Sequence, residues 1–97
     1  MINSEQKIFL RSASHHKSIV VWIGQKGLTK NVAKEIEMAL DYHELVKVRI
    51  RLDDREVRDK LIKKICKEHE AHLVQKIGSV ILLFRQSTEN PQIILPH

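Results

Sequence analysis

The feature that most constrains the fold is a short apolar run, Ile19 to Ile23, that stops at Gly24 and leads into a helix pattern. Its β-branched composition favours a strand whose two faces are both at least partly covered. Thr29 is a suitable N-cap for a helix ending near Tyr42, because apolar residues recur there at three- and four-residue steps. Strands joined through a helix imply parallel pairing by a right-handed crossover, so the sequence predicts an α/β fold.

The segment from Val46 to Leu52 alternates without interruption between apolar and basic residues. Its basic members, Lys47, Arg49 and Arg51, share one direction and its apolar members share the other. The pattern predicts a strand with one wet, basic face. Such a ladder of charge can track phosphates, but a charged outer face also keeps an exposed strand soluble, and the residues alone leave both interpretations open.

Two further helices flank these strands in the predicted order. Ser4 is a suitable cap for a first helix that runs to about His15. Asp53 or Asp54 starts a third helix, which should fade around residue 69 or 70. Both helices carry an apolar stripe that needs a sheet to cover it.

The last predicted elements are two strands, His72–Ile77 and Val80–Phe84, joined by a two-residue turn at Gly78 and Ser79. The order is therefore α-β-α-β-α-β-β in a mixed four-stranded sheet. We expect two helices to cover one face and the first helix to cover part of the other. Residues 1–97 should form one domain, with residues 86–97 as a loosely attached C-terminal tail because they are polar and contain two prolines.

The charge balance narrows the class of partner. The 97 residues carry a formal charge of +5, which favours polyanions such as nucleic acid or acidic membrane surfaces. No apolar run is long enough to span a bilayer and no signal-peptide pattern precedes residue 11, so we expect a cytoplasmic protein. The single cysteine, Cys66, cannot form an internal disulfide, which agrees with a reducing compartment.

The segment Gly24-Gln25-Lys26-Gly27 is a Gly-x-x-Gly loop between the first strand and the second helix. Two residues without Cβ atoms let backbone N–H groups approach a phosphate closely, and the helix that follows adds the positive end of its dipole. Lys30 and Lys34 place further charge on the first turns of that helix. The alternative is a simple strand-to-helix turn, and the residues favour neither interpretation strongly. A Walker loop is excluded, because Gly27 is followed by Leu28 and Thr29 rather than by lysine.

Other candidate sites are weaker. Four aromatic residues are few for a protein that reads bases by stacking, and we expect Trp22 to pack in the core. The six histidines do not share metal-ligand spacing, so we expect no metal and no cofactor. No nucleophile has a base at useful spacing, which argues against an enzyme and against a small-molecule substrate.

The sequence as a whole resembles the CRM domain, whose stand-alone bacterial form is the YhbY family. The resemblance rests on residues 15–17, 19–29, 35–36, 39–40, 43–48, 54–56, 73–78 and 83–85, and so covers nearly the whole chain. It implies an RNA-binding fold similar to the C-terminal domain of translation initiation factor three. The family is associated with maturation of the large ribosomal subunit in bacteria and with intron splicing in plant organelles.

This resemblance implies precursor ribosomal RNA, or particles that precede the large subunit, as the partner, and it favours Lys47 as a contact. Lys17 is a candidate backbone contact near the loop, with a simple turn residue as the alternative. We expect the protein to be a monomer. A second hypothesis is a protein-interaction module that docks acidic ribosomal or assembly proteins. The residues expected to bind RNA are Gly24, Gln25, Lys26, Gly27, Lys17, Lys30, Lys34, Lys47 and Arg49.

Overall fold

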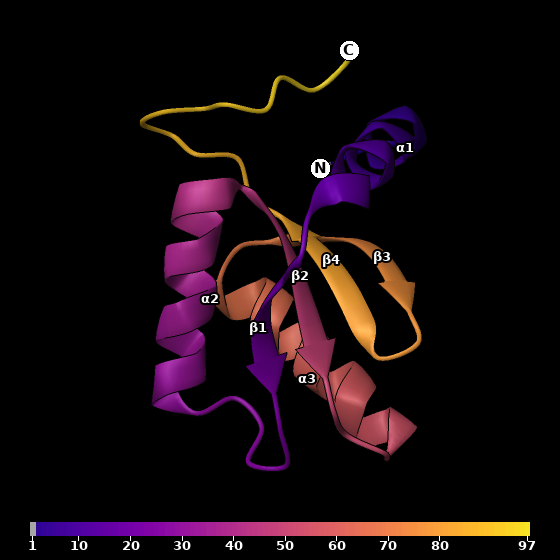
Figure 1. Ribbon diagram of the computed structural model, residues 1–97, viewed down its shortest axis with the longest axis vertical. Helices are drawn as coiled ribbons and strands as arrows, with labels where there is room; N and C mark the ends of the chain where they lie inside the picture. The colour runs from indigo at the N-terminus through magenta and orange to yellow at the C-terminus, as the bar shows by residue number, and fades with distance from the viewer. Residues whose placement is uncertain (1) are drawn as a thin grey trace.

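The computed structural model describes residues 2–97, and its elements follow the order expected from the sequence (Figure 1). Three α-helices and a short 3-10 helix alternate with a four-stranded mixed sheet. The bounds are α1 Ser4–Ala13, η1 Ser14–His16, β1 Ile19–Ile23, α2 Lys30–His43, β2 Leu45–Ile50, α3 Arg55–Glu68, β3 His72–Ile77 and β4 Val80–Phe84.

The sheet has the strand order β1-β2-β4-β3. The strands β1 and β2 are parallel and are joined through α2, whereas β4 is antiparallel to both of its neighbours. Gly78 has a φ of +57° at the first position of the two-residue turn between β3 and β4, as a type II′ turn requires. The α/β class and the mixed four-stranded sheet predicted from the sequence are confirmed.

The two faces of the sheet are covered unequally. The helices α2 and α3 pack on one face, where the alternate residues Val46, Val48 and Ile50 of β2 are buried with Ile36 and Ile65 of the helices. On the other face a smaller cluster joins α1 to one side of the sheet, through Leu10, Leu45, Val74, Leu82 and Phe84. Within residues 2–97, no helix packs on the rest of that second face.

Local capping sets the ends of the helices. Asn3 rather than Ser4 caps α1, because its side chain accepts from the Gln6 backbone while the Gln6 side chain accepts from the Asn3 backbone. Our choice of Ser4 was wrong, because the first helical turn starts one residue earlier than the apolar pattern suggests. Thr29 and Asp54 cap α2 and α3 as predicted.

The C-terminal tail folds back over the end of the sheet away from the glycine loop (Figure 1). Ile93 and Leu95 pack against the cluster beneath α1. Glu44, only 1% exposed, accepts backbone hydrogen bonds from Ser87, Gln92 and Ile93 at 2.7 to 2.9 Å. Residues 86–97 are therefore attached at several points, more closely than a polar, proline-containing sequence suggests.

Candidate nucleic-acid interface

The glycine loop is a tight turn held by two backbone hydrogen bonds. Gly27 N donates to Gly24 O at 3.0 Å, and Thr29 N donates to Gly27 O at 3.0 Å. The same threonine then caps α2 through its hydroxyl, which accepts from Val32 N. The chain thus turns from β1 into α2 with little slack, and the side chains of Gln25 and Lys26 are exposed.

The fold favours glycine at one of the two glycine positions of this loop and not at the other. Gly27 has a φ of +70°, a left-handed conformation that costs an ordinary L-residue about 1–2 kcal/mol. Gly24 does not have a positive φ, and a Cβ built on it meets nothing within 4 Å. The fold therefore favours glycine at position 27 but places no demand for it at position 24.

Two other chain segments lie at the same end of the sheet as the loop. Arg51 N donates to Ile23 O at 2.8 Å, and the Gln25 side chain reaches Arg51 O at 3.5 Å. Ile50 N donates to Ser79 O at 2.7 Å. The loop, the carboxyl end of β2 and the hairpin turn are therefore neighbours, although the chain separates them widely.

The structure brings together only part of the predicted basic surface. Lys26 lies in the loop, and Lys30 and Lys34 follow on the exposed side of α2. Arg49 pairs across the sheet with Trp22, close to the loop, whereas Lys47 pairs with Ile19 at the beginning of β1.

Lys17 is placed away from the loop. It precedes β1 whereas the loop follows it, so the whole strand separates the two, and the expectation that Lys17 supplies charge beside the loop does not fit the structure. The chain order was the signal against this placement, because the predicted strand Ile19–Ile23 already separated Lys17 from the loop.

Trp22 is not a core residue. Its side chain is 52% exposed, whereas its neighbours Val21 and Ile23 are almost completely buried. The prediction of core packing was wrong because only every second residue of β1 faces α2 and α3. The strictly alternating partner strand β2, whose basic residues face the same way as Trp22, was the signal that could have indicated this exposure.

Lys26 and Lys30 stand outside the ion pairs formed within residues 2–97. Those ion pairs use His69, Lys76 or Arg85, and the pair of Lys76 with Asp59 lies near the hairpin turn. Arg49 Nε is buried without a hydrogen-bond partner in this part of the chain. The described residues therefore do not neutralise the charge of Lys26 and Lys30.

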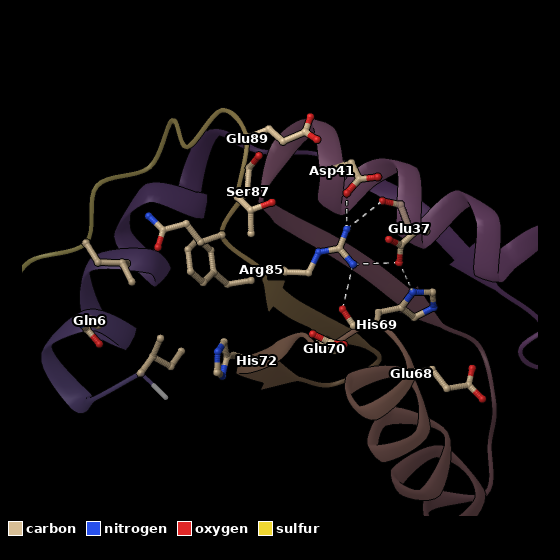
Figure 2. Close-up of a pocket in the computed structure, with 15 residues that line it drawn as sticks. Gln6, Glu37, Asp41, Glu68, His69, Glu70, His72, Arg85, Ser87 and Glu89 are labelled. Carbon is tan, nitrogen blue, oxygen red and sulfur yellow. Dashed lines mark hydrogen bonds and ion pairs between the residues drawn. The ribbon is translucent and has the colours of Figure 1, made fainter.

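Arg85, at the opposite end, is used by the protein itself (Figure 2). Its guanidinium donates to Glu37 Oε1 at 2.9 Å, to Asp41 Oδ1 at 2.6 Å and to the carbonyl of His69 at 3.0 Å. The hydrogen bond from Arg85, followed by that from His69, holds the pKa of Glu37 below its ordinary value. Arg85 therefore ties the end of β4 to α2 and α3.

The rest of the described chain offers few groups that could bind a metal or react with a substrate. No three metal-ligating side chains cluster within residues 2–97, and burial raises the pKa of the Cys66 thiol. None of the helices described here is long and apolar enough to cross a bilayer.

Comparison with known proteins decides the family. The model of the CRS1/YhbY (CRM) domain matches residues 2–85. This chain belongs to the CRM family. The matched residues contain every helix and strand of the fold, so the CRM domain spans nearly the whole chain.

Individual CRM relatives agree in length as well as in sequence. An RNA-binding protein of Haemophilus influenzae is 43% identical over 98% of this chain and 95% of its own. A protein of Bacillus subtilis named probable RNA-binding protein YqeI is 38% identical over 99% of this chain and its whole length. The solution structure of a hypothetical protein from Staphylococcus aureus superposes with a TM-score of 0.83 at 34% identity, covering 99% of this chain and all of the other.

Proposed function

We propose that this CRM domain is an RNA-binding protein, not an enzyme, and that its glycine loop grips the sugar-phosphate backbone. The observation that carries the proposal is Gly24. The fold does not require a glycine there, because its backbone is unstrained and a Cβ would have room. Glycine also serves where the backbone of a ligand must approach the protein backbone closely, because it has no Cβ atom in the way. Position 24 has no reason within the fold to be glycine, so we assign it this second use.

The surroundings of Gly24 suit a phosphate. Lys26 is exposed within the loop, and Lys30 begins α2, whose N-terminus carries partial positive charge. Neither lysine has an ion-pair partner among the ion pairs of residues 2–97. A Gly-x-x-Gly loop that clamps nucleotides by their backbone is also the mode of KH domains.

The proposed RNA is precursor ribosomal RNA during assembly of the large subunit. Two lines support this partner: the relatives named as RNA-binding proteins, and the association of the family with large-subunit maturation. A protein that acts by shape and charge on assembling RNA needs no cofactor, and none is included in the proposal.

The decisive experiment measures RNA affinity as a function of salt. We expect a linear loss of log affinity with log salt, with a slope of about −0.7 for each phosphate contacted on a single strand. Gly24→Asp combined with Lys26→Glu should weaken binding by about tenfold or more and make the slope shallower by about one. A flat salt response of the wild type, or unchanged affinity of this variant, contradicts the loop mode.

A matched control separates the loop from overall charge. Lys64→Glu combined with Asn90→Asp lowers the net charge by the same three units at exposed positions on α3 and in the tail. This control should bind within about twofold of the wild type at about 0.1 M salt, where charges beyond about 10 Å are screened. Nuclease treatment of ribosomal particles tests the partner: release of the protein supports RNA, and retention indicates an acidic protein partner instead.

A further inference from the structure

The uncovered part of the sheet carries a mixed aromatic, apolar and basic surface, which we call the open face. It consists of Val20, Trp22, Lys47, Arg49, Gln75, Ile77 and Val80. We propose that the open face binds unpaired RNA nucleotides, with a base stacked on Trp22. This inference rests on the proposed function and extends it from backbone grip to base contact.

The strand registers place these residues in one continuous row. Trp22 on β1 pairs with Arg49 on β2, Arg49 pairs with Val80 on β4, and Val80 pairs with Ile77 on β3. Paired residues of neighbouring strands point to the same face and lie about 4.8 Å apart in the hydrogen-bonding direction. The row therefore crosses the whole sheet, from the edge beside the glycine loop to the opposite edge.

A second row lies behind the first. Ile19 and Val20 lie at a bulge of β1 opposite Lys47, which pairs with Leu82, and Leu82 pairs with Gln75. The β3 end of this row is covered by α1, which packs against β3. The short helix η1 lies near β2. The two rows together form the open face, which the α1–η1 segment borders on one side and which is exposed on the other.

Several apolar side chains of the open face are exposed although no contact within residues 2–97 requires them there. Trp22 is 52% exposed, Ile77 64% and Val20 40%. Grouped apolar exposure of this kind marks an interaction surface more often than chance scatter does. A hollow of about 500 Å³ lies where the open face meets Arg11 and His15 of the α1–η1 segment.

The charge of the open face selects a polyanion as the occupant. Its ionisable residues are Lys47 and Arg49, with Arg11 and His15 at the rim, and no carboxylate is among the open-face residues or those lining the hollow. Arg49 Nε is buried and lacks a hydrogen-bond partner among residues 2–97. An uncharged apolar partner would leave these cations without compensation.

The combination of an aromatic ring with flanking cations favours unpaired nucleotides among polyanions. Bases of a single strand can stack on an aromatic side chain while phosphates meet lysine or arginine, whereas a duplex keeps its base faces stacked inside. Position supports the same occupant, because Trp22 lies two residues before Gly24. An RNA strand whose backbone is held at the glycine loop can continue directly onto the open face.

The chain provides its own probe for this proposal. Trp22 is the single tryptophan, so the emission of the intact protein reports on this one side chain. Titration with an unstructured RNA of cytidine and adenosine, about 12 nucleotides long, should quench and saturate the emission. A duplex of equal length should quench it much less. Equal quenching by both, or none by the single strand while it binds, overturns the proposal.

Substitution gives an independent measurement. Trp22→Ala should weaken binding of the unpaired RNA about 5- to 150-fold, the range for loss of one stacked base, and Trp22→Phe should restore part of it. The matched control is Tyr42→Ala, which removes an aromatic side chain that is 75% exposed on α2, far from the open face, and should leave affinity unchanged. Unchanged affinity of Trp22→Ala contradicts the proposal.

The two proposals fail in distinguishable ways. If wild-type protein binds no RNA, the proposed function fails and the open-face proposal fails with it. If binding depends on Gly24 and Lys26 but not on Trp22, only the open-face proposal is overturned. If the protein instead dimerises in sedimentation and Trp22→Ala makes it monomeric, the open face is an interface between copies of this chain and the proposal is wrong.

Discussion

The exposed lysines beside the glycine loop and Arg85 at the other end of the sheet differ in whether carboxylates neutralise their charge. At the loop end, Lys26 and Lys30 are exposed and stand outside the ion pairs formed within residues 2–97. At the other end, the Arg85 side chain is 19% exposed and is enclosed by Glu37, Asp41 and a backbone carbonyl (Figure 2). Position relative to carboxylates, rather than basicity, separates Arg85, which holds the fold together, from the lysines that we propose bind RNA.

This contrast assigns different consequences to changes at the two ends. A change of Gly24 or of the exposed lysines at the loop end should alter RNA affinity and leave stability nearly intact, since these residues make few internal contacts. A change at the Arg85 end should do the reverse. The following predictions test that separation, beginning with the largest expected effect.

Arg85→Ala should lower the free energy of unfolding by about 2 kcal/mol, because it removes charge-assisted hydrogen bonds to two carboxylates and a carbonyl. The value is moderate because the Glu37 and Asp41 side chains are 47% and 70% exposed and solvent compensates part of the loss. Urea denaturation measures it. RNA affinity of the folded variant should stay within about twofold of the wild type, and a large loss of affinity would place Arg85 in the interface.

The two loop glycines should separate stability from binding within four residues. Gly27→Ala should cost about 1 kcal/mol of stability, because alanine must adopt the left-handed φ of +70°. Gly24→Ala should change stability by no more than about 0.5 kcal/mol and yet weaken RNA binding. Thermal or urea unfolding, paired with RNA titration, checks both. Strong destabilisation by Gly24→Ala would remove the main support for the loop proposal.

Acid should weaken the end of the sheet away from the glycine loop. Burial raises the pKa of Glu44, but the backbone hydrogen bonds from Ser87, Ile93 and Gln92 outweigh it, and the pKa is lowered from 4.5. The Arg85 hydrogen bond lowers the pKa of Glu37 likewise. A carboxyl whose folded pKa is lowered stabilises the protein above its unfolded pKa, and that stabilisation is lost as pH falls through the folded pKa.

Unfolding free energies measured from neutral pH to below pH 4.5 should therefore decline, and Glu44→Gln should flatten part of that decline. A decline equally steep in the variant would show that Glu44 does not contribute. The variant itself should be less stable at neutral pH, since an amide offers a donor where the carboxylate accepts three backbone N–H groups.

Periodicity in the sequence predicted most of the fold because each strand and helix buries a regular set of side chains. The strands β1, β3 and β4 have the predicted bounds, and β2 differs by a residue or two. Contacts between distant segments were not predictable in the same way. Arg85 meets Glu37 across 48 positions, and no local pattern indicates that pairing.

The candidate site divides along the same line. The loop and its following lysines are contiguous in sequence, so their proximity could be predicted. The position of Lys17 away from the loop also followed from the chain order, because the predicted strand β1 lies between them. Trp22 required knowledge of which face of β1 it occupies. The strand pairing supplied that knowledge, because it set Trp22 beside Arg49 on a face that the helices leave uncovered.

The carboxylate of Glu44 also bears on where the chain can be shortened. The family match stops at residue 85, just after β4, and a boundary drawn there would keep every helix and strand. It would also remove three backbone donors from the carboxylate of Glu44, which is 1% exposed, and take Ile93 and Leu95 away from the cluster beneath α1. We therefore expect a chain shortened to residue 85 to be less stable than the full chain, although it keeps every regular element.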